Sequence, residues 1–471
     1  MRKTWLTSAL ALSVLLLALA GCAQQAAAPA APAAAPTAAA AVKAAAPTVA
    51  AAVQQAAPTA AAAAKSGERP KMTVWLQKSF TPEADALQKK YVEDWAAAKG
   101  VDVTIVQDSS TVLNPQFNAA IESKNLPDVL TWASIDWAPK LERLGLTLDV
   151  TDVVNKMNSR GGGLQDAALR AVMKDGKAFA IPTHGATEII YLRKDLADAK
   201  GIKPPETWEE LFAAAKALTD KGKVWGYGEQ LGTASFDAEI ATLSKLAAYG
   251  ASPYAADGKT PNLNNEGTRK LLAMIKDAWD AGAIPADAVT WDDSGNNKAY
   301  LTGAAAMVYN TGSILNAMRK DDPELLKKTL ALPIPGGPQG KRQIQYVYGL
   351  IIPNTTKNPE LAKDLVDYYT DPKRQADIVV AAGTNYMPMY KDLAKEPIWQ
   401  DPTNKLLIDQ LASTNAVGWP GPTTDWALEA WRQHTMTEMV DKVLVEGKSI
   451  DQAIQETEAK LVKIYEQFNK K

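Results

Sequence analysis

Cysteine and histidine are scarce in this sequence of 471 residues, which contains one cysteine, Cys22, and two histidines, His184 and His434. A single cysteine cannot form a disulfide within the chain. So few thiol and imidazole groups also cannot build the usual zinc-ligand sets or a thiol nucleophile with its base. We therefore expect neither a resident metal nor another cofactor.

The sequence also lacks the common enzyme signatures. It has no Gly-x-Ser-x-Gly elbow, no Gly-x-x-x-x-Gly-Lys phosphate loop and no Gly-x-Gly-x-x-Gly fingerprint. Lysine and arginine number 51 against 53 acidic residues, and no basic stripe indicates nucleic-acid binding. We expect a protein that is not an enzyme and has no catalytic residues. A glycoside hydrolase, which needs only two carboxylates, stays open as an alternative.

The N-terminus has the features of a lipoprotein signal. Arg2 and Lys3 provide positive charge, residues 6–19 form an apolar run too short to span a bilayer stably, and Leu19-Ala20-Gly21-Cys22 ends it. The pattern predicts a signal peptide over residues 1–21 and acylation of Cys22, which places the mature chain outside the cytoplasm and anchors it to a membrane. An ordinary signal peptide with an incidental cysteine is the alternative. No further apolar run of membrane-spanning length follows.

A segment dominated by alanine and proline occupies residues 22–67. Prolines at 29, 32, 36, 47 and 58 interrupt any helix, and methyl side chains bury too little apolar area to offset the cost of ordering the backbone. We expect a disordered tether there. The remaining residues, roughly 400, are too many for one compact core, which predicts two domains of ~200 residues each.

In the rest of the chain, short apolar runs alternate with longer amphipathic ones, which predicts an α/β fold. Strands are predicted over 72–76, 101–106 and 126–130, and helices over 82–98 and 114–124. In an open α/β sheet, ligands bind beyond the carboxyl ends of the strands. Residues that directly follow these strands are therefore candidates for a binding site.

Two further helices have clear start signals. Thr207 precedes Glu210 by three positions, which predicts a capping box in which each side chain bonds to the other's backbone. Asn358 followed by Pro359 predicts an asparagine cap with proline at the first helical position.

Six segments of the chain occur in the order found in one protein family. They are Asn125-Leu-Pro-Asp-Val-Leu130, Ala180-Ile-Pro182 with Ile190-Tyr-Leu-Arg-Lys-Asp-Leu196, Pro205-Glu-Thr-Trp-Glu-Glu210, Gly303-Ala-Ala-Ala-Met307, Pro335-Gly-Gly-Pro338 and Asn358-Pro-Glu-Leu-Ala362. Behind a lipoprotein signal and a tether, this order resembles the extracellular solute-binding proteins of ABC importers. The group includes maltose-binding protein and other carbohydrate binders, and the resemblance covers nearly the whole body from about Lys71 onward.

The resemblance implies a two-lobed periplasmic-binding-protein type II fold, in which each lobe is a sheet flanked by helices and a hinge joins the lobes. Lobe 1 would comprise residues 68–184 and 350–390, and lobe 2 residues 190–345 and 395–471, including the C-terminal helices. A sugar or oligosaccharide would bind in the cleft between the lobes. The partners implied are this solute and the permease subunits in the membrane, and the protein is expected to be a monomer.

A sugar presents hydroxyl groups that need hydrogen bonds and C–H faces that pack flat on aromatic rings, and tryptophan combines a large flat area with a polar edge. The chain has 13 tryptophans but only 6 phenylalanines. Most of the tryptophans, such as Trp95 and Trp279, are expected to pack in the core. The tryptophans at strand ends or in loops where the family places its cleft are candidates for ligand contact: Trp75, Trp132, Trp225, Trp419 and Trp426.

Polar candidates follow from the same resemblance. His184 lies at the first presumed crossing between lobes, where its side chain can reach the solute, although a purely structural histidine is the alternative. Lys78 and Asp136 follow strands and can form charge-assisted hydrogen bonds with hydroxyl groups. The remaining candidates lie in loops or beside the crossings: Tyr227, Gly312, Ser313, Tyr346, Tyr348 and Asn385.

The hinge segment departs from the family pattern. Residues 183–188 carry histidine and glycine where maltose-binding protein leads us to expect an acidic group. The identity of the solute therefore cannot be transferred, and a polyol or a sugar phosphate stays open beside a neutral sugar. A lipid-anchored adhesin that captures no solute is a third possibility.

Overall fold

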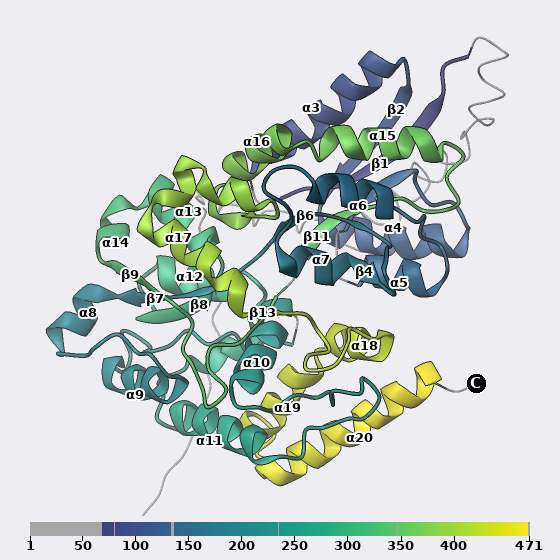
Figure 1. Ribbon diagram of the computed structural model, residues 1–471. Coiled ribbons are helices and arrows are strands. Elements are labelled where there is room, and N and C mark those ends of the chain that lie inside the picture. Colours follow the sequence, from purple (N-terminus) through teal and green to yellow (C-terminus); the bar gives the residue numbers. More distant parts are fainter. Residues whose placement is uncertain (1–67, 80, 133–135, 234, 346, 470–471) are drawn as a thin grey trace, which may run out of the picture. The chain divides into compact units, whose positions relative to one another are not determined.

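A computed structural model of the protein describes residues 68–79, 81–132, 136–233, 235–345 and 347–469 (Figure 1). The predicted signal peptide, Cys22, the tether and Tyr346 lie outside these residues. The predicted α/β class is confirmed, because the strands of two main sheets alternate with helices along the chain.

The first sheet has six strands, in the order β12 (Met387–Pro388), β6 (Ile181–Gly185), β11 (Val347–Ile351), β3 (Val129–Thr131), β1 (Lys71–Gln77) and β2 (Asp102–Asp108). β1 runs parallel to β2 and β3, whereas β11 is antiparallel to β3 and β6. Val74 and Trp75 of β1, whose side chains point to opposite faces, are almost completely buried, as expected for a strand covered on both faces.

Helices cover both faces of this sheet (Figure 1). α3 (Pro82–Lys99) contacts α15 (Pro359–Tyr369) and α16 (Pro372–Ala382), and α15 also contacts α6 (Thr151–Asn158). α7 (Asp166–Val172) contacts β6 and β11. Trp137, the first residue of α5 (Trp137–Arg143), stacks on Phe117 of α4 (Ser110–Glu122) with ring centroids 4.0 Å apart.

The second sheet has three antiparallel strands, in the order β8 (Met307–Asn310), β7 (Ile189–Arg193) and β9 (Thr329–Leu332). Ile190 and Leu192 of β7 are buried in a second hydrophobic core. The helices in this part of the chain are α8 (Lys194–Ala199), α9 (Trp208–Leu218), α10 (Phe236–Ala248), α11 (Glu266–Asp280), α12 (Gly295–Leu301), α13 (Ser313–Asp321) and α14 (Pro323–Lys327). The C-terminal helices α18 (Asp425–Arg432), α19 (Thr435–Leu444) and α20 (Ile450–Asn469) contribute to the same core.

Shorter elements complete the described chain. β4 (Met173–Lys174) pairs with β5 (Lys177–Ala178), and β10 (Gln343–Ile344) pairs with β13 (Thr414–Asn415). The others are α17 (Pro402–Asp409) and the 3-10 helices η1 (Ala286–Thr290), η2 (Gly383–Asn385), η3 (Lys391–Lys395), η4 (Pro397–Gln400) and η5 (Gln410–Ser413).

The chain passes from the first sheet to the second between Gly185 and Ile189, and β10 precedes its return to the first sheet at Val347. The first sheet packs in one hydrophobic core, which contains Leu130 and also Ile189 and Tyr191 of β7. The alternate residues of β7 face a second core, which contains Leu246. The predicted lobe boundaries stay a prediction, which the division into two sheets supports.

Of the two predicted helix starts, the first is confirmed, and the second is confirmed in position, with Pro359 as the first residue of α15, but wrong in its capping bond. The Thr207 hydroxyl accepts from the Glu210 backbone, and the Glu210 carboxylate accepts from the Thr207 backbone, which completes the capping box of α9. Asn358 precedes α15, but its side chain makes no capping hydrogen bond. Its amide instead donates to the Lys71 carbonyl at 3.1 Å and ties the helix start to β1.

Candidate functional site

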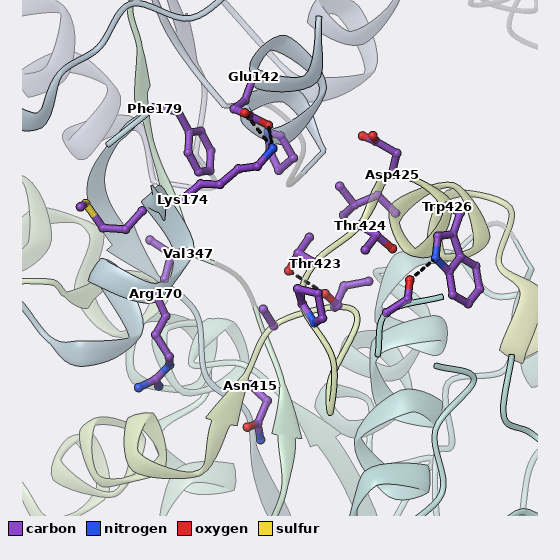
Figure 2. A pocket seen from close by; sticks show the side chains of 18 of the residues that line it. Glu142, Arg170, Lys174, Phe179, Val347, Asn415, Thr423, Thr424, Asp425 and Trp426 are labelled. Carbon is purple, nitrogen blue, oxygen red and sulfur yellow. Dashed lines mark hydrogen bonds and ion pairs between the residues drawn. The ribbon is translucent and has the colours of Figure 1, made fainter. Parts of the chain in front are cut away.

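A cavity of about 630 Å³ lies where residues of the two cores approach each other (Figure 2). Its volume falls within the range of small-molecule sites, roughly 300–1,000 Å³. α5, α7 and the β4–β5 hairpin contribute one wall, and the segment that leads into α18 contributes the other. The side chains labelled in Figure 2 are Glu142, Arg170, Lys174, Phe179, Val347, Asn415, Thr423, Thr424, Asp425 and Trp426.

Trp132 is placed at this cavity by β3. Its backbone N–H donates to the Gly349 carbonyl of β11 at 3.0 Å, which fixes the residue at the end of the strand pair. The side chain lines the cavity and is only 3% exposed. Its indole N–H is buried and has no hydrogen-bond partner among the described residues. Such a donor costs free energy unless another molecule accepts from it.

Trp426 also lines the cavity, so two of the predicted tryptophans are brought together there. Its indole N–H donates to the Gly258 carbonyl at 2.7 Å, and its ring packs edge-on against Tyr254 with centroids 5.0 Å apart. The polar edge of Trp426 is therefore already bonded, and only its apolar ring is available to a solute.

Two ion pairs border the cavity. Lys174 Nζ lies 2.8 and 2.7 Å from the two carboxylate oxygens of Glu142. Arg143 Nε lies 2.7 Å from Asp425 Oδ1, which links the end of α5 to the start of α18. Both carboxylates are thus neutralised by a neighbouring cation in the protein itself.

β11 separates the cavity from a cluster of stacked rings. Side chains alternate along a strand, so Val347, which lines the cavity, and Tyr348 point to opposite faces. The rings of His184 and Tyr348 lie 5.2 Å apart, and those of His184 and Tyr386 lie 3.6 Å apart. We call His184, Tyr348 and Tyr386 the histidine stack. The predicted residues His184 and Tyr348 therefore lie together, but on the other side of the strand from the cavity.

Burial lowers the pKa of His184 to about 3, so its imidazole is neutral at physiological pH. In the unfolded chain a histidine titrates near ~6.5, so the unfolded state binds the proton more readily. The stability that neutral His184 provides is complete above about pH 6.5 and is lost as the pH falls toward 3. We expect His184→Gln to reduce the loss of unfolding free energy between pH 7 and 5, measured by urea denaturation. Equal losses in the two proteins would contradict the assignment.

Three predicted residues lie close to the histidine stack. Gly312 precedes α13, and Ser313 is its first residue. The Thr384 hydroxyl donates to the Gly312 carbonyl at 2.8 Å, and a Cβ at Gly312 would lie 2.0 Å from the Thr384 carbonyl oxygen, so only glycine allows this contact. The Asn385 amide donates to the Thr81 hydroxyl at 3.4 Å, while its own oxygen is buried without a partner among the described residues.

Four predicted residues are placed mainly by packing or by local bonds. Trp75 and Tyr227 are completely buried in the first and the second core. Lys78 is half exposed and lies 3.7 Å from Asp108. Asp136 precedes α5, but its side chain does not cap the helix. None of the four lines the cavity, and their part in binding stays a prediction.

The last two predicted tryptophans also lie outside the cavity. Trp225 is 36% exposed and forms a backbone bridge with Ala305 beside the second sheet. The Trp419 carbonyl accepts from the Ser252 hydroxyl at 2.5 Å, and the Arg342 guanidinium lies 5.8 Å from the centre of its ring. Their role in binding likewise stays a prediction.

The cavity includes residues that sequence reasoning missed, notably Arg170 and Phe179. Ala167, Arg170 and Ala171 share one face of α7, because residues three and four apart are neighbours on a helix. That spacing shows which face they share, but not what the face meets. Within the described residues, no group of three or more His, Cys, Asp or Glu side chains is arranged to hold a metal ion.

Comparison with known proteins defines the class. A model of the bacterial extracellular solute-binding protein family matches residues 90–406. The chain therefore belongs to the bacterial extracellular solute-binding proteins, a family that works outside the cytoplasm. None of the helices in the described part has the length and apolar character needed to cross a membrane.

Individual binding proteins are also similar to this chain in sequence. A binding protein of Brucella abortus (strain 2308) is 26% identical over 224 residues, 47% of this chain and 53% of the relative. The arabinooligosaccharide-binding protein of Bacillus subtilis (strain 168) is 24% identical over 229 residues, 47% of this chain and 50% of the relative. The chain thus aligns with about half the length of these curated relatives.

A solved structure confirms the predicted binding-protein fold. The solute-binding protein of an ABC transporter from Thermotoga lettingae TMO, crystallised with alpha-D-tagatose, superposes with a TM-score of 0.71. The match covers 84% of this chain and 99% of that chain at 17% sequence identity. At this identity the similarity shows the fold and not the solute.

Proposed function

We propose that this chain captures a sugar or oligosaccharide in the cavity beside Trp132 and delivers it unchanged to the permease of an ABC importer. Family membership supports the class of function, and a relative that is named for binding arabinooligosaccharides supports the class of solute. The observation that carries the proposal is the Trp132 side chain, whose ring lies in the cavity wall and whose indole N–H has no hydrogen-bond partner among the described residues.

The rest of the wall suits a sugar. The rings of Trp132, Phe179 and Trp426 can pack against C–H faces, and Thr424 and Asn415 can exchange hydrogen bonds with hydroxyl groups. Since both cores contribute to the wall, a solute bound there contacts both sides at once. If the hinge allows the two sides to separate, such a solute stabilises the conformation in which both sides contact it, by the difference between its affinities for the two conformations.

We further propose that the mature chain is a monomer anchored through an acylated Cys22. The N-terminal signal pattern and the Ala/Pro-rich segment 22–67 support this proposal. An anchor on a tether of this composition keeps the loaded protein near its permease. The resulting local concentration then replaces a high intrinsic docking affinity.

A glycoside hydrolase is not favoured by the carboxylates of the cavity. Glu142 is ion-paired with Lys174 and Asp425 with Arg143, so both carboxylates already have a partner in the protein. A glycosidase needs two carboxyl groups that are free to react with the bound sugar.

A thermal-shift screen tests the proposal. A solute that binds only the folded protein stabilises it by RT ln(1 + [L]/Kd), about 2.7 kcal/mol at a concentration a hundred times Kd. We expect one or more mono- or oligosaccharides to raise the melting temperature in a saturable way. Chromatography of the incubated solute checks that it is recovered unchanged. A screen in which polyols or other solutes raise the melting temperature but sugars do not would contradict the carbohydrate assignment.

A further inference from the structure

Six charged side chains line the cavity: Glu142, Arg170, Lys174, Asp257, Lys259 and Asp425. Their formal charges cancel, so the net charge does not select a solute. What differs is whether each group is already bonded. Glu142 and Asp425 are ion-paired with Lys174 and Arg143, as described above. Asp257 accepts three hydrogen bonds within its own turn, at 2.8 to 3.0 Å, from the backbones of Lys259 and Thr260 and from the Thr260 hydroxyl.

Arg170 is in the opposite situation. Its side chain is exposed and lines the cavity, and its guanidinium has no ion pair or hydrogen bond with any described residue. Figure 2 shows it directed away from the Glu142–Lys174 pair. Ala167 and Ala171 line the cavity from the same helix, and their small side chains leave space beside the guanidinium. Lys259 also has no ion pair among the described residues, but its charge attracts the Asp257 carboxylate in the same turn.

We propose that the solute is a sugar carrying an anionic group, a uronate or a phosphate ester, and that this group pairs with Arg170. The proposal rests on the proposed function and specifies the solute class of the same site. Guanidinium binds carboxylate and phosphate oxygens through two parallel hydrogen bonds, a geometry that an ammonium group does not reproduce. Glu142, Asp257 and Asp425 already have partners in the protein. The anionic group of a bound sugar can therefore pair with the Arg170 guanidinium without facing an unpaired carboxylate in the cavity wall.

The test compares matched sugars by isothermal titration calorimetry on the mature chain. Galactobiose and digalacturonate differ in charge at C6, and galactose and galactose 6-phosphate form the second pair. We expect the wild type to bind one of the anionic sugars at least tenfold more tightly than its neutral counterpart. Which pair shows the preference distinguishes a carboxylate from a phosphate.

Variants assign the preference to Arg170. Arg170→Gln is expected to lower the affinity for the anionic sugar at least tenfold more than the affinity for the neutral sugar and so remove the preference, and Arg170→Lys is expected to retain part of it. Arg69→Gln, which removes an exposed arginine outside the cavity, serves as the matched control and should leave all affinities unchanged. Circular dichroism melting verifies that each variant is folded.

The outcomes separate this inference from the function on which it rests. A wild type that binds neutral sugars as tightly as anionic ones would overturn the role of Arg170 and leave the proposed function standing. Equal losses for both sugars in Arg170→Gln would likewise overturn it, because they indicate a positional role. Absence of binding to every sugar, neutral or anionic, would overturn both proposals.

Discussion

Replacing Lys245 with methionine is expected to lower the free energy of unfolding by about 3–5 kcal/mol, because it leaves Glu229 as an unpaired charge in the second core. Lys245 Nζ lies 2.7 Å from Glu229 Oε1, and the two side chains are 0% and 1% exposed. The ammonium also lies 5.3 Å from the centre of the Trp208 ring and donates to the Ala241 carbonyl at 3.1 Å.

Urea denaturation measures this effect, with Lys90→Met as the matched control. Lys90 pairs with Asp94 on the exposed side of α3, where solvent screens the attraction and an ion pair contributes little. The double variant Lys245→Met with Glu229→Gln is expected to recover part of the loss, because it removes the stranded charge. A loss below about 1 kcal/mol in the single variant would show that the pair is not closed off from solvent as described.

Truncation of Trp132 is expected to have the largest effect on function. Trp132→Ala removes an aromatic ring from the cavity wall together with its indole N–H. We therefore expect solute affinity to fall roughly 30- to 100-fold, about 2–3 kcal/mol. The solute found in the thermal screen is titrated calorimetrically into wild type and variant. Trp279→Ala, the same truncation on α11 outside the cavity, controls for general effects of losing an indole.

Trp132 is also part of the first core, so the variant must be examined for folding. Trp132→Phe keeps most of the apolar area but removes the N–H, and we expect it to stay folded with an intermediate affinity. Unchanged affinity in both folded variants would exclude Trp132 from the solute site. Unfolding of both would assign the residue to packing alone.

Features set by neighbours in sequence could be predicted from the sequence. The capping box of α9 depends on two residues three positions apart, and it forms as predicted. The alternation of short and long apolar runs predicted the α/β class for the same reason, because the spacing of apolar residues within a short stretch of sequence distinguishes a strand from a helix. The order of six segments gave the family, which the match over residues 90–406 confirms.

Features set by distant partners could not be predicted. Asn358 bonds to Lys71, 287 positions away, and therefore does not act as the cap that its local sequence indicates. The cavity depends on contacts of the same kind, because α5, α7 and α18 meet there from separate regions of the chain. For the same reason the sequence grouped His184 with Trp132 as candidates, while β11 places them on opposite sides.

The ion pair between Arg143 and Asp425 bears on how readily a bound solute can be released. A solute-binding protein that delivers its solute must release it after each binding event. An ion pair between the two walls of the cavity should therefore be weak enough to separate. The two side chains are 38% and 27% exposed, and a pair in that setting contributes little. Asp425 also lies in the first turn of α18, where the helix dipole stabilises a negative charge after the arginine has moved away. Under the proposed function, separation of this ion pair on solute release leaves both side chains in contact with solvent. The buried pair of Lys245 and Glu229 differs, because its separation would leave two charges inside the core.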